Sequence, residues 1–211
     1  GLPSGIHDSI AFAGGIGGLV TVFKLALAQM RVDGGAPEAN LARAGRFIAE
    51  AAAAGAHVVL LPETLNLGWT HRSALTGADE IPGGATCESV RAAARRHGVY
   101  VCAGLVESAG ALRFNSAVLL SPQGELLLHH RKLNELDIAH DLYANGDRLG
   151  VAHTPLGTFG LMICADAFAR GQVVSRTLGL MGAQVILSPC AWAVPADHDN
   201  VRLPYGWRWL E

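Results

Sequence analysis

The feature that most constrains the fold of this chain is the alternation of short apolar runs with longer amphipathic segments. The runs carry hydrophobic residues at successive positions, as strands do when both faces of their sheet are covered. They occupy residues 23–30, 56–61, 99–106, 158–164 and 184–187. Helical spacing of apolar residues predicts helices at 37–54, 86–97 and 172–181. Strands that alternate with helices in this way indicate an α/β fold.

A predicted β-hairpin interrupts this alternation in the middle of the chain. Two apolar runs, 114–120 and 125–130, flank the sequence Ser-Pro-Gln-Gly at 121–124, and proline and glycine at such positions favour a turn. A hairpin makes adjacent strands antiparallel, so we expect a mixed sheet. In α/β proteins, ligands bind beyond the carboxyl ends of the strands, and we expect the functional residues there.

Three reactive side chains stand at the ends of these predicted strands. Glu63 and Cys164 each close an apolar run, and Lys132 follows the second hairpin strand. A thiol attacks carbon only as the thiolate, and an ordinary thiol is mostly protonated at pH 7. A glutamate can remove that proton, while a lysine and a backbone N–H, here that of Ala165, can stabilise the oxyanion. We therefore interpret Glu63, Lys132 and Cys164 as base, electrostatic stabiliser and nucleophile.

Each of the three residues also has an ordinary structural interpretation. Glu63 alone is explained as a solvated carboxylate, and Lys132 alone as a charge that keeps a strand edge soluble. A single cysteine such as Cys164 is more often a small buried hydrophobic residue than a nucleophile. The combination favours catalysis, because all three residues end strands that we expect to share one sheet system.

The chain from Phe23 to its last residue resembles the nitrilase superfamily of carbon–nitrogen hydrolases. The matching segments, in order, are KLALAQMRVD (24–33), Asn40, VVLLPE (58–63), FNSAVLLSPQGELLLHHRK (114–132), GLMICAD (160–166) and ILSPCAW (186–192). The resemblance implies a four-layer αββα sandwich, a homodimer or larger homo-oligomer, and neither a metal nor an organic cofactor. It also implies a Glu-Lys-Cys triad, whose positions here are Glu63, Lys132 and Cys164.

The same resemblance implies a reaction and a substrate class. The thiolate attacks an amide-type carbon, ammonia or an amine leaves, and water hydrolyses the thioester. Many members carry a second acidic residue after the lysine, for which we prefer Glu135, with Asp141 as the alternative. Nitrile-hydrolysing members resemble Cys-Trp-Glu at the nucleophile, whereas Cys-Ala-Asp at 164–166 is similar to the amidase and carbamoyl-hydrolase branches. The implied substrates are small amide or N-carbamoyl compounds.

Several side chains close to this expected site need an interpretation of their own. Asp166 is expected to orient the loop, Trp192 either lines the pocket or packs in the core, and Cys190 is expected to be inert. His129 and His130 are neighbours in a predicted strand. Because they then point to opposite faces, at most one of them can face the site.

Composition excludes several classes of function. The formal net charge is −2 and the basic residues are scattered, so we expect neither nucleic acid nor a membrane surface as a partner. The four cysteines form no CxxC pair, and scattered thiols are typical of cytoplasmic proteins. Residues 9–23 are apolar but contain four glycines and no preceding Lys or Arg. That pattern favours neither a signal peptide nor a membrane span.

The sequence predicts two segments and leaves two alternative functions open. Residues 1–21 are expected to form an unstructured leader, with a true start near Val22, and 22–211 a carbon–nitrogen hydrolase domain that is incomplete at its C-terminus. Residues 203–211 look like the opening of a further element. An inactive truncated paralogue or fragment that binds a small molecule or a protein is one alternative. The other is a doubly wound binding module. Against it, this chain has no glycine-rich loop after its first predicted strand.

Overall fold

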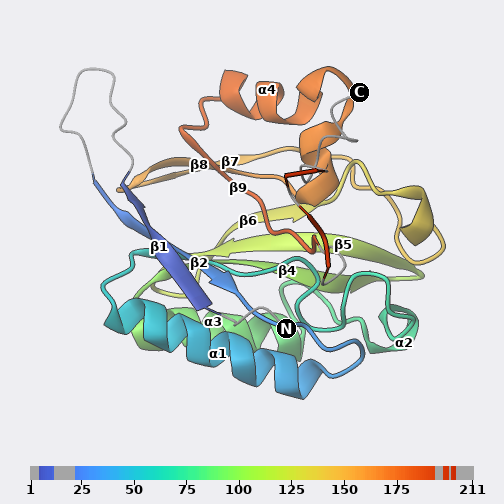
Figure 1. Ribbon diagram of the computed structural model, residues 1–211, viewed down its shortest axis with the longest axis horizontal. Helices are drawn as coiled ribbons and strands as arrows, with labels where there is room; N and C mark the ends of the chain where they lie inside the picture. Colours follow the sequence, from blue (N-terminus) through green and yellow to red (C-terminus); the bar gives the residue numbers. More distant parts are fainter. Residues whose placement is uncertain (1–4, 12–21, 193–196, 200, 203–211) are drawn as a thin grey trace.

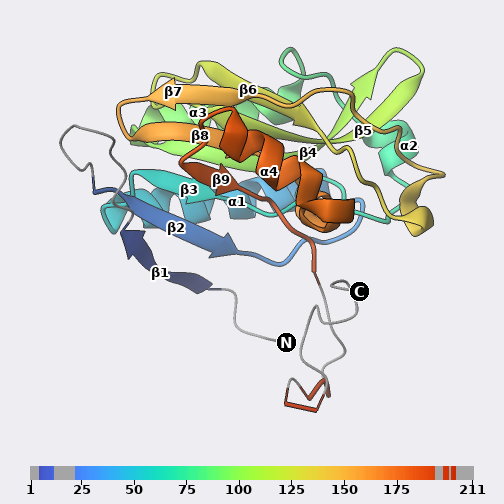
Figure 2. The same cartoon turned by 90° about the horizontal axis from the view of Figure 1, so that it is seen from above.

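The computed structural model describes residues 5–11, 22–192, 197–199 and 201–202. Its elements form four layers, in the order helices, large sheet, small sheet and helix (Figure 1). A view from above shows α4 (Val173–Leu180) lying across the small sheet (Figure 2). The α/β class and the αββα sandwich expected from the sequence are therefore confirmed.

The two sheets are both mixed. The large sheet holds, in spatial order, β1 (Gly5–Ala11), β2 (Lys24–Gln29), β3 (Val58–Leu60), β4 (Tyr100–Ala109), β5 (Leu112–Leu120) and β6 (Leu126–Arg131). Strands β2, β3 and β4 are parallel, whereas β4, β5 and β6 are antiparallel. The small sheet holds β7 (Val151–Thr154), β8 (Gly157–Leu161) and β9 (Val185–Leu187), with β8 and β9 parallel.

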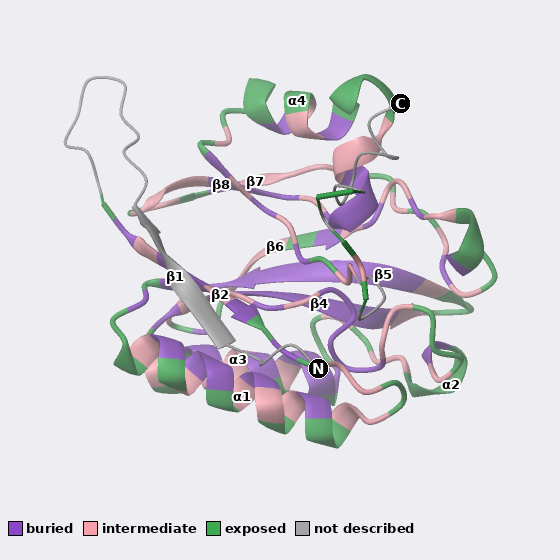
Figure 3. Ribbon diagram, viewed as in Figure 1, coloured by how far each residue is buried: buried purple, intermediate pink, exposed green. Residues whose placement is uncertain are grey.

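Two long helices cover the outer face of the large sheet. Helix α1 (Pro37–Ala53) begins at a proline, which suits the first helical turn because its missing N–H has no partner there. Helix α3 (Ala85–His97) ends before Gly98, whose φ of 65° is the left-handed conformation that glycine adopts readily. Helix α1 turns its buried face to the sheet and its exposed face outward (Figure 3), and Cys87, Val90 and Ala94 form the buried face of α3.

Apolar side chains fill both interfaces of the large sheet. On the helix side, Ile48 and Val90 belong to a cluster with Val59 and Val101. On the other side, a second cluster joins the two sheets, with Phe23 and Phe159 edge to face at 5.6 Å between ring centroids. Val58 and Val59 are successive residues in different clusters, as expected for a strand that is buried on both faces.

The N-terminal segment differs from the sequence-based expectation. Residues 1–21 were expected to lack regular structure, but Gly5–Ala11 forms β1, which pairs antiparallel with β2. The pairing supplies main-chain partners along the outer edge of β2, which would otherwise be an open sheet edge. The rest of the expected leader, residues 1–4 and 12–21, lies outside the described residues. The same holds for residues 203–211, which were expected to open a further element.

Four short helices complete the described chain. They are α2 (Ala74–Gly77) and three 3-10 turns, η1 (Asp137–Ala139), η2 (Cys164–Phe168) and η3 (Arg170–Gln172). Of these, η2 positions the site, because it begins at the expected nucleophile. None of the helices in the described part of the chain is long and apolar enough to cross a membrane.

Candidate active site

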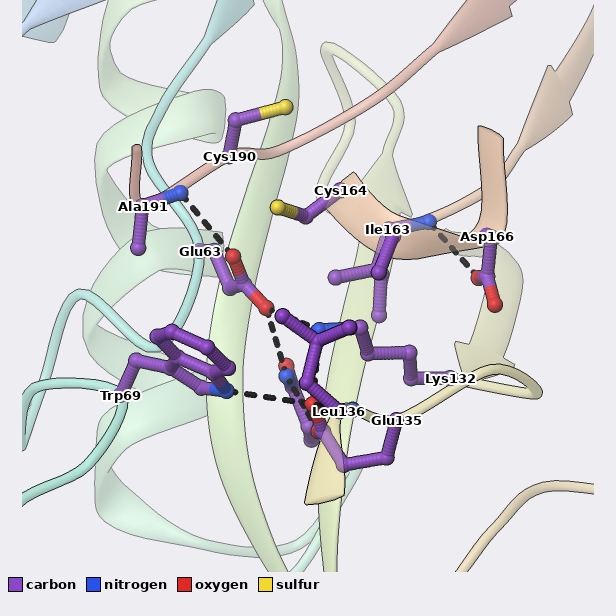
Figure 4. A network of polar contacts seen from close by, with 12 residues as sticks. Glu63, Trp69, Lys132, Glu135, Leu136, Ile163, Cys164, Asp166, Cys190 and Ala191 are labelled. Atoms are coloured by element: carbon purple, nitrogen blue, oxygen red, sulfur yellow. Dashed lines mark hydrogen bonds and ion pairs between the residues drawn. The ribbon is translucent and has the colours of Figure 1, made fainter. Parts of the chain in front are cut away.

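The structure brings together the residues expected to act. Glu63 lies beyond the end of β3, Lys132 directly after β6, and Cys164 three residues after the end of β8. All three residues are buried, with exposed fractions of 1%, 1% and 7%. Figure 4 shows Glu63 between Cys164 and the loop that carries Glu135. Strand ends from both sheets thus converge on one buried polar site.

Lys132 forms the centre of this site. Its Nζ lies 2.8 Å from Oε1 of Glu63 and 2.9 Å from Oε1 of Glu135. Asn115 joins the same carboxylates, since its Nδ2 donates to Glu63 at 2.7 Å and to Glu135 at 3.0 Å. Burial lowers the pKa of Lys132, but the two carboxylates outweigh burial and raise that pKa above its usual value. The lysine is therefore a fixed positive charge.

Glu63 is held by donors on both of its carboxylate oxygens. Oε1 accepts from Asn115 and Lys132, and Oε2 accepts from the backbone N–H of Ala191 at 2.9 Å. Its backbone is fixed by close approach to β4: a Cβ built on Gly104 would lie 2.5 Å from the Glu63 Cα. Glycine at position 104 is thus a requirement for placing the carboxylate.

Cys164 lies on a turn and not in the strand that was expected to end with it. Strand β8 ends at Leu161, and Cys164 has a φ of 43°, which is uncommon for a residue with a side chain. Its backbone N–H donates to the Pro189 carbonyl at 3.1 Å and to Ser188 Oγ at 3.2 Å. The residues after β9 therefore hold the turn that presents the thiol.

The thiol of Cys164 has polar neighbours of its own. A hydrogen bond with Cys190, burial and the charge of Glu63 raise the pKa of Cys164, while Lys132 lowers it. The same hydrogen bond lowers the pKa of Cys190 to about 7. A raised pKa favours the protonated thiol of Cys164, and a protonated thiol would need a base before it could attack carbon. Cys190, expected from the sequence to be inert, lies beside Cys164.

The two candidates for the second acid are in different places. Glu135 is buried and accepts from Trp69 Nε1 at 3.2 Å and from the backbone N–H of Leu136 at 3.0 Å, in addition to Lys132. Asp141 is exposed and lines a surface depression with Arg113. The structure therefore brings Glu135, and not Asp141, to Lys132.

Asp166 occupies the loop-orienting position expected of it. Its side chain is fully buried. One oxygen accepts from the backbone N–H groups of Leu133 and Asn134, at 3.0 and 2.8 Å. The other accepts from the N–H of Ile163 at 2.9 Å and pairs with His130 Nε2 at 2.8 Å. These bonds tie the Cys164 turn to the loop that follows Lys132.

The adjacent histidines point to opposite faces, as expected. His130 faces Asp166, while His129 pairs with Glu107 at 2.8 Å on the other face of the sheet. Neither histidine ring is paired with the thiol by these contacts. The structure therefore pairs neither of these two histidines with Cys164.

The two residues expected near the oxyanion or pocket are both beside the nucleophile. Ala165 follows Cys164 and is 2% exposed, and its carbonyl accepts from Asn134 Nδ2 at 2.7 Å. Trp192 donates from Nε1 to the Cys164 sulfur. Its ring also packs on Phe168 with 5.1 Å between centroids. Trp192 therefore packs against the apolar cluster between the sheets and also contacts the Cys164 sulfur.

Sequence reasoning missed Trp69, Asn115 and the N–H of Ala191. Asn115 lies within FNSAVLL, a segment that carries the family resemblance, so its position contained a signal. Trp69 follows a glycine in an irregular segment and has no such signal. Among the described residues, no group of three or more His, Cys, Asp or Glu side chains is arranged to hold a metal ion.

Comparisons with known proteins agree with this fold. Residues 24–210 match the family model described as carbon-nitrogen hydrolase, and the chain belongs to that family. A nitrilase of Pyrococcus abyssi is 35% identical over 177 residues, which cover 82% of this chain and 66% of that protein. The omega-amidase NIT2 of Xenopus tropicalis is 32% identical over 181 residues, 81% of this chain and 64% of that protein.

A solved structure supports the fold. The NitN amidase of Nesterenkonia sp. AN1 superposes with a TM-score of 0.74 at 24% identity, over 82% of this chain and 68% of that one. A double mutant of that amidase in complex with acrylamide gives a TM-score of 0.76 at 22% identity, over 86% and 70% of the two chains. The chain spans 66% and 64% of the length of the two curated relatives above.

Proposed function

We propose that this protein hydrolyses the carbon–nitrogen bond of small amide or N-carbamoyl compounds through a thioester on Cys164. The observation that carries the proposal is the buried Lys132, held by Glu63 and Glu135 beside a thiol that a strained turn presents. Burying a charge costs free energy unless the charge is paired. A buried cluster of one lysine and two carboxylates, such as Lys132 with Glu63 and Glu135, therefore favours a catalytic role. Membership of the carbon–nitrogen hydrolase family supports the same reaction class.

The first step forms the carbon–sulfur bond. Glu63 takes the thiol proton of Cys164, and the sulfur attacks the carbonyl carbon of the substrate. The negative charge that develops on the carbonyl oxygen is stabilised by the Lys132 ammonium and the backbone N–H of Ala165. Because the pKa of Cys164 is raised, proton removal by Glu63 belongs to this step and does not precede it.

The second step breaks the carbon–nitrogen bond and regenerates the thiol. The protonated Glu63 gives its proton to the leaving nitrogen, so ammonia or an amine departs and a thioester remains on Cys164. A water molecule then loses a proton to Glu63 and attacks the thioester carbon. The acid product leaves as the sulfur recovers its proton. Glu63 thus serves as base and acid in turn, from a position fixed by Asn115 and Ala191.

Glu135 acts in this scheme through the lysine. It accepts from Lys132 at 2.9 Å and raises the pKa of that ammonium group together with Glu63. Trp69 and the Leu136 N–H donate to the same carboxylate and fix its direction. We propose that Glu135 is a positioning residue that keeps Lys132 charged and aimed at the oxyanion.

The test is ammonia release from a panel of small amides and N-carbamoyl compounds. We expect turnover by the wild-type chain, an intact-mass increase that corresponds to the acyl group, and loss of both in Cys164→Ala. Removing a nucleophile costs about 10³-fold or more. Cys87→Ala, a buried cysteine of helix α3, is the matched control. Turnover that persists in Cys164→Ala refutes the thioester route.

The alternative function is a fragment that binds a small molecule or a protein without turnover. The observation in its favour is that a thiol with a raised pKa, such as that of Cys164, is a weaker nucleophile at neutral pH. It predicts that calorimetry detects binding of an amide while the acyl-enzyme mass is absent. An acyl-enzyme on Cys164 excludes it.

We also propose that the protein works in the cytoplasm as a homodimer or larger homo-oligomer. The cysteines in the described part of the chain are free, which supports a reducing compartment such as the cytoplasm. On the outer side of α4, Val173 is 55% exposed and Leu180 is 90% exposed. Exposed apolar side chains on one helix support a homodimer or larger homo-oligomer. Light scattering on the purified chain tests this, and a monomer at micromolar concentration contradicts it.

A further inference from the structure

The strands of the small sheet place a second thiol opposite the nucleophile. Strand β8 pairs in parallel with β9, and Leu161 is the partner of Leu187. The pairing continues past the strands, since the Cys164 N–H donates to the Pro189 carbonyl at 3.1 Å. The same offset makes Cys190 the partner of Cys164. Neighbouring strands lie about 4.8 Å apart, within the roughly 4.4–6.8 Å between Cα atoms that a disulfide requires.

The side chains of the two cysteines meet as well as their backbones. Each thiol shifts the pKa of the other, that of Cys164 upward and that of Cys190 downward, and Figure 4 shows both sulfur atoms on the same side of Glu63. Ser188 holds the pair from behind: its Oγ accepts from the Cys164 N–H at 3.2 Å and lies 3.7 Å from the Cys190 sulfur. Ser188 therefore contacts both members of the pair.

The two thiols differ in access and in acidity. Cys190 is exposed, whereas Cys164 is 7% exposed, and Cys87 and Cys102 are fully buried. The Cys164 side chain lowers the pKa of Cys190, which favours formation of its thiolate. An accessible thiol with a lowered pKa beside a second thiol is the arrangement that oxidants attack first.

We propose that Cys164 and Cys190 form a reversible disulfide when the protein meets a peroxide, and that this pair is a redox modification site. The Cys190 thiolate attacks one oxygen of hydrogen peroxide, the O–O bond breaks, and hydroxide leaves, so Cys190 becomes a sulfenic acid. The Cys164 sulfur then gives up its proton and attacks the Cys190 sulfur, and the S–O bond breaks. In sum, two thiols and one peroxide give one disulfide and two waters.

The consequence for activity rests on the proposed function. In the disulfide, the Cys164 sulfur is bonded to Cys190 and cannot become the thiolate that attacks an amide carbon, so turnover stops until a dithiol reduces the bond. Bonding to Cys190 also keeps Cys164 from the irreversible sulfinic acid. The pair therefore protects the nucleophile while it is inactive.

Mass spectrometry of the whole chain tests the proposal without any variant. The wild-type protein is treated with hydrogen peroxide, its remaining thiols are blocked with N-ethylmaleimide under denaturing conditions, and it is digested with trypsin. Arg170 and Arg176 separate the two cysteines into different peptides, 149–170 and 177–202. We expect these peptides as one cross-linked species that dithiothreitol resolves. Separate peptides with sulfinic acid or maleimide on both cysteines overturn the proposal.

Two variants assign the bond. Cys190→Ser is expected to abolish the cross-linked species and to raise the sulfinic acid on Cys164 at least tenfold, whereas Cys87→Ser retains the cross-link. Cross-linking of Cys164 to Cys87 or Cys102 in any of these proteins contradicts the assignment. The mass readout is independent of turnover. A disulfide without amide hydrolysis therefore refutes the proposed function alone, and hydrolysis without a disulfide refutes this inference alone.

Discussion

The ammonium group of Lys132 lies 2.8 Å from Oε1 of Glu63, and the two side chains are 1% and 0% exposed. The lysine also pairs with the carboxylate of Glu135, so one cation stands between two anions in a site closed to solvent. Such a cluster is stable only while its charges remain paired, because removal of one member leaves uncompensated buried charge. We therefore expect the stability of the fold to depend on residues to which we also assign part of the proposed chemistry.

Replacing Lys132 tests this dependence. In Lys132→Met, the carboxylates of Glu63 and Glu135 lose their common partner, and we expect the free energy of unfolding to fall by about 3–5 kcal/mol. Urea denaturation followed by circular dichroism measures the change. Lys24→Met is the control, since the Lys24 ammonium donates to the Ala54 carbonyl at an exposed site. It should change stability by no more than about 1 kcal/mol, and equal losses in both variants would contradict the buried-cluster explanation.

The pH dependence of kcat/KM distinguishes the role of Glu135 from that of Asp141. The charge of Glu135 raises the pKa of Lys132, so Glu135→Gln lowers that pKa. If the protonated lysine is required, the alkaline limb of kcat/KM moves to lower pH in Glu135→Gln. Asp141→Asn changes an exposed residue away from the lysine and should leave the profile in place. If the alkaline limb of kcat/KM stays at its wild-type pH in Glu135→Gln, the expectation is refuted. A shift of that limb in Asp141→Asn would refute it as well.

Much of the fold was predictable because hydrophobic periodicity reports burial. Helix α1 was expected at 37–54 and is found at Pro37–Ala53, and the hairpin strands β5 and β6 lie where the turn sequence placed them. Periodicity fails where burial is not regular. The apolar run 158–164 was taken as one strand, yet β8 ends at Leu161, because a buried turn and a buried strand have the same hydrophobic sequence.

The site was predictable only as a set of strand ends. Sequence order and resemblance indicated Glu63, Lys132 and Cys164, and the structure brings them to one place. The contacts of Trp69 and the pairing of Cys164 with Cys190 depend on how separate segments meet in space. Neither the helix period nor the strand period encodes such contacts, so they required the coordinates.

The polar cluster on the other face of the sheet predicts how stability depends on pH. Glu107 is 1% exposed and accepts from Ser116, His129 and Arg131. Burial raises the pKa of Glu107, but these partners outweigh it and lower the pKa from 4.5 to about 2. An acid with a lowered pKa contributes stability above its unfolded pKa, and this contribution is lost as the pH falls through 4.5 toward 2.

Glu107→Gln measures that contribution. The difference in unfolding free energy between the wild type and the variant should be no more than about 3 kcal/mol near pH 5. It should shrink as the pH falls from about 4.5 to about 2. Urea denaturation at a series of pH values gives the curve. A difference that does not vary over this range would show that the charge of Glu107 is not what its partners stabilise.

Gly104 has no side chain, and this allows the backbone of Glu63 to lie close to β4. A Cβ on Gly104 would lie 2.5 Å from the Glu63 Cα and 2.7 Å from the Pro62 carbonyl oxygen, which are backbone atoms that cannot rotate away. We expect Gly104→Ala to lower the free energy of unfolding by about 1–3 kcal/mol and to displace the carboxylate, so kcat falls more than stability alone explains. Gly45→Ala is the control: it lies in α1 with nothing within 4 Å of the added Cβ. Alanine there should raise stability by about 0.5–1 kcal/mol, and a Gly104→Ala protein with wild-type stability and kcat would contradict the close approach.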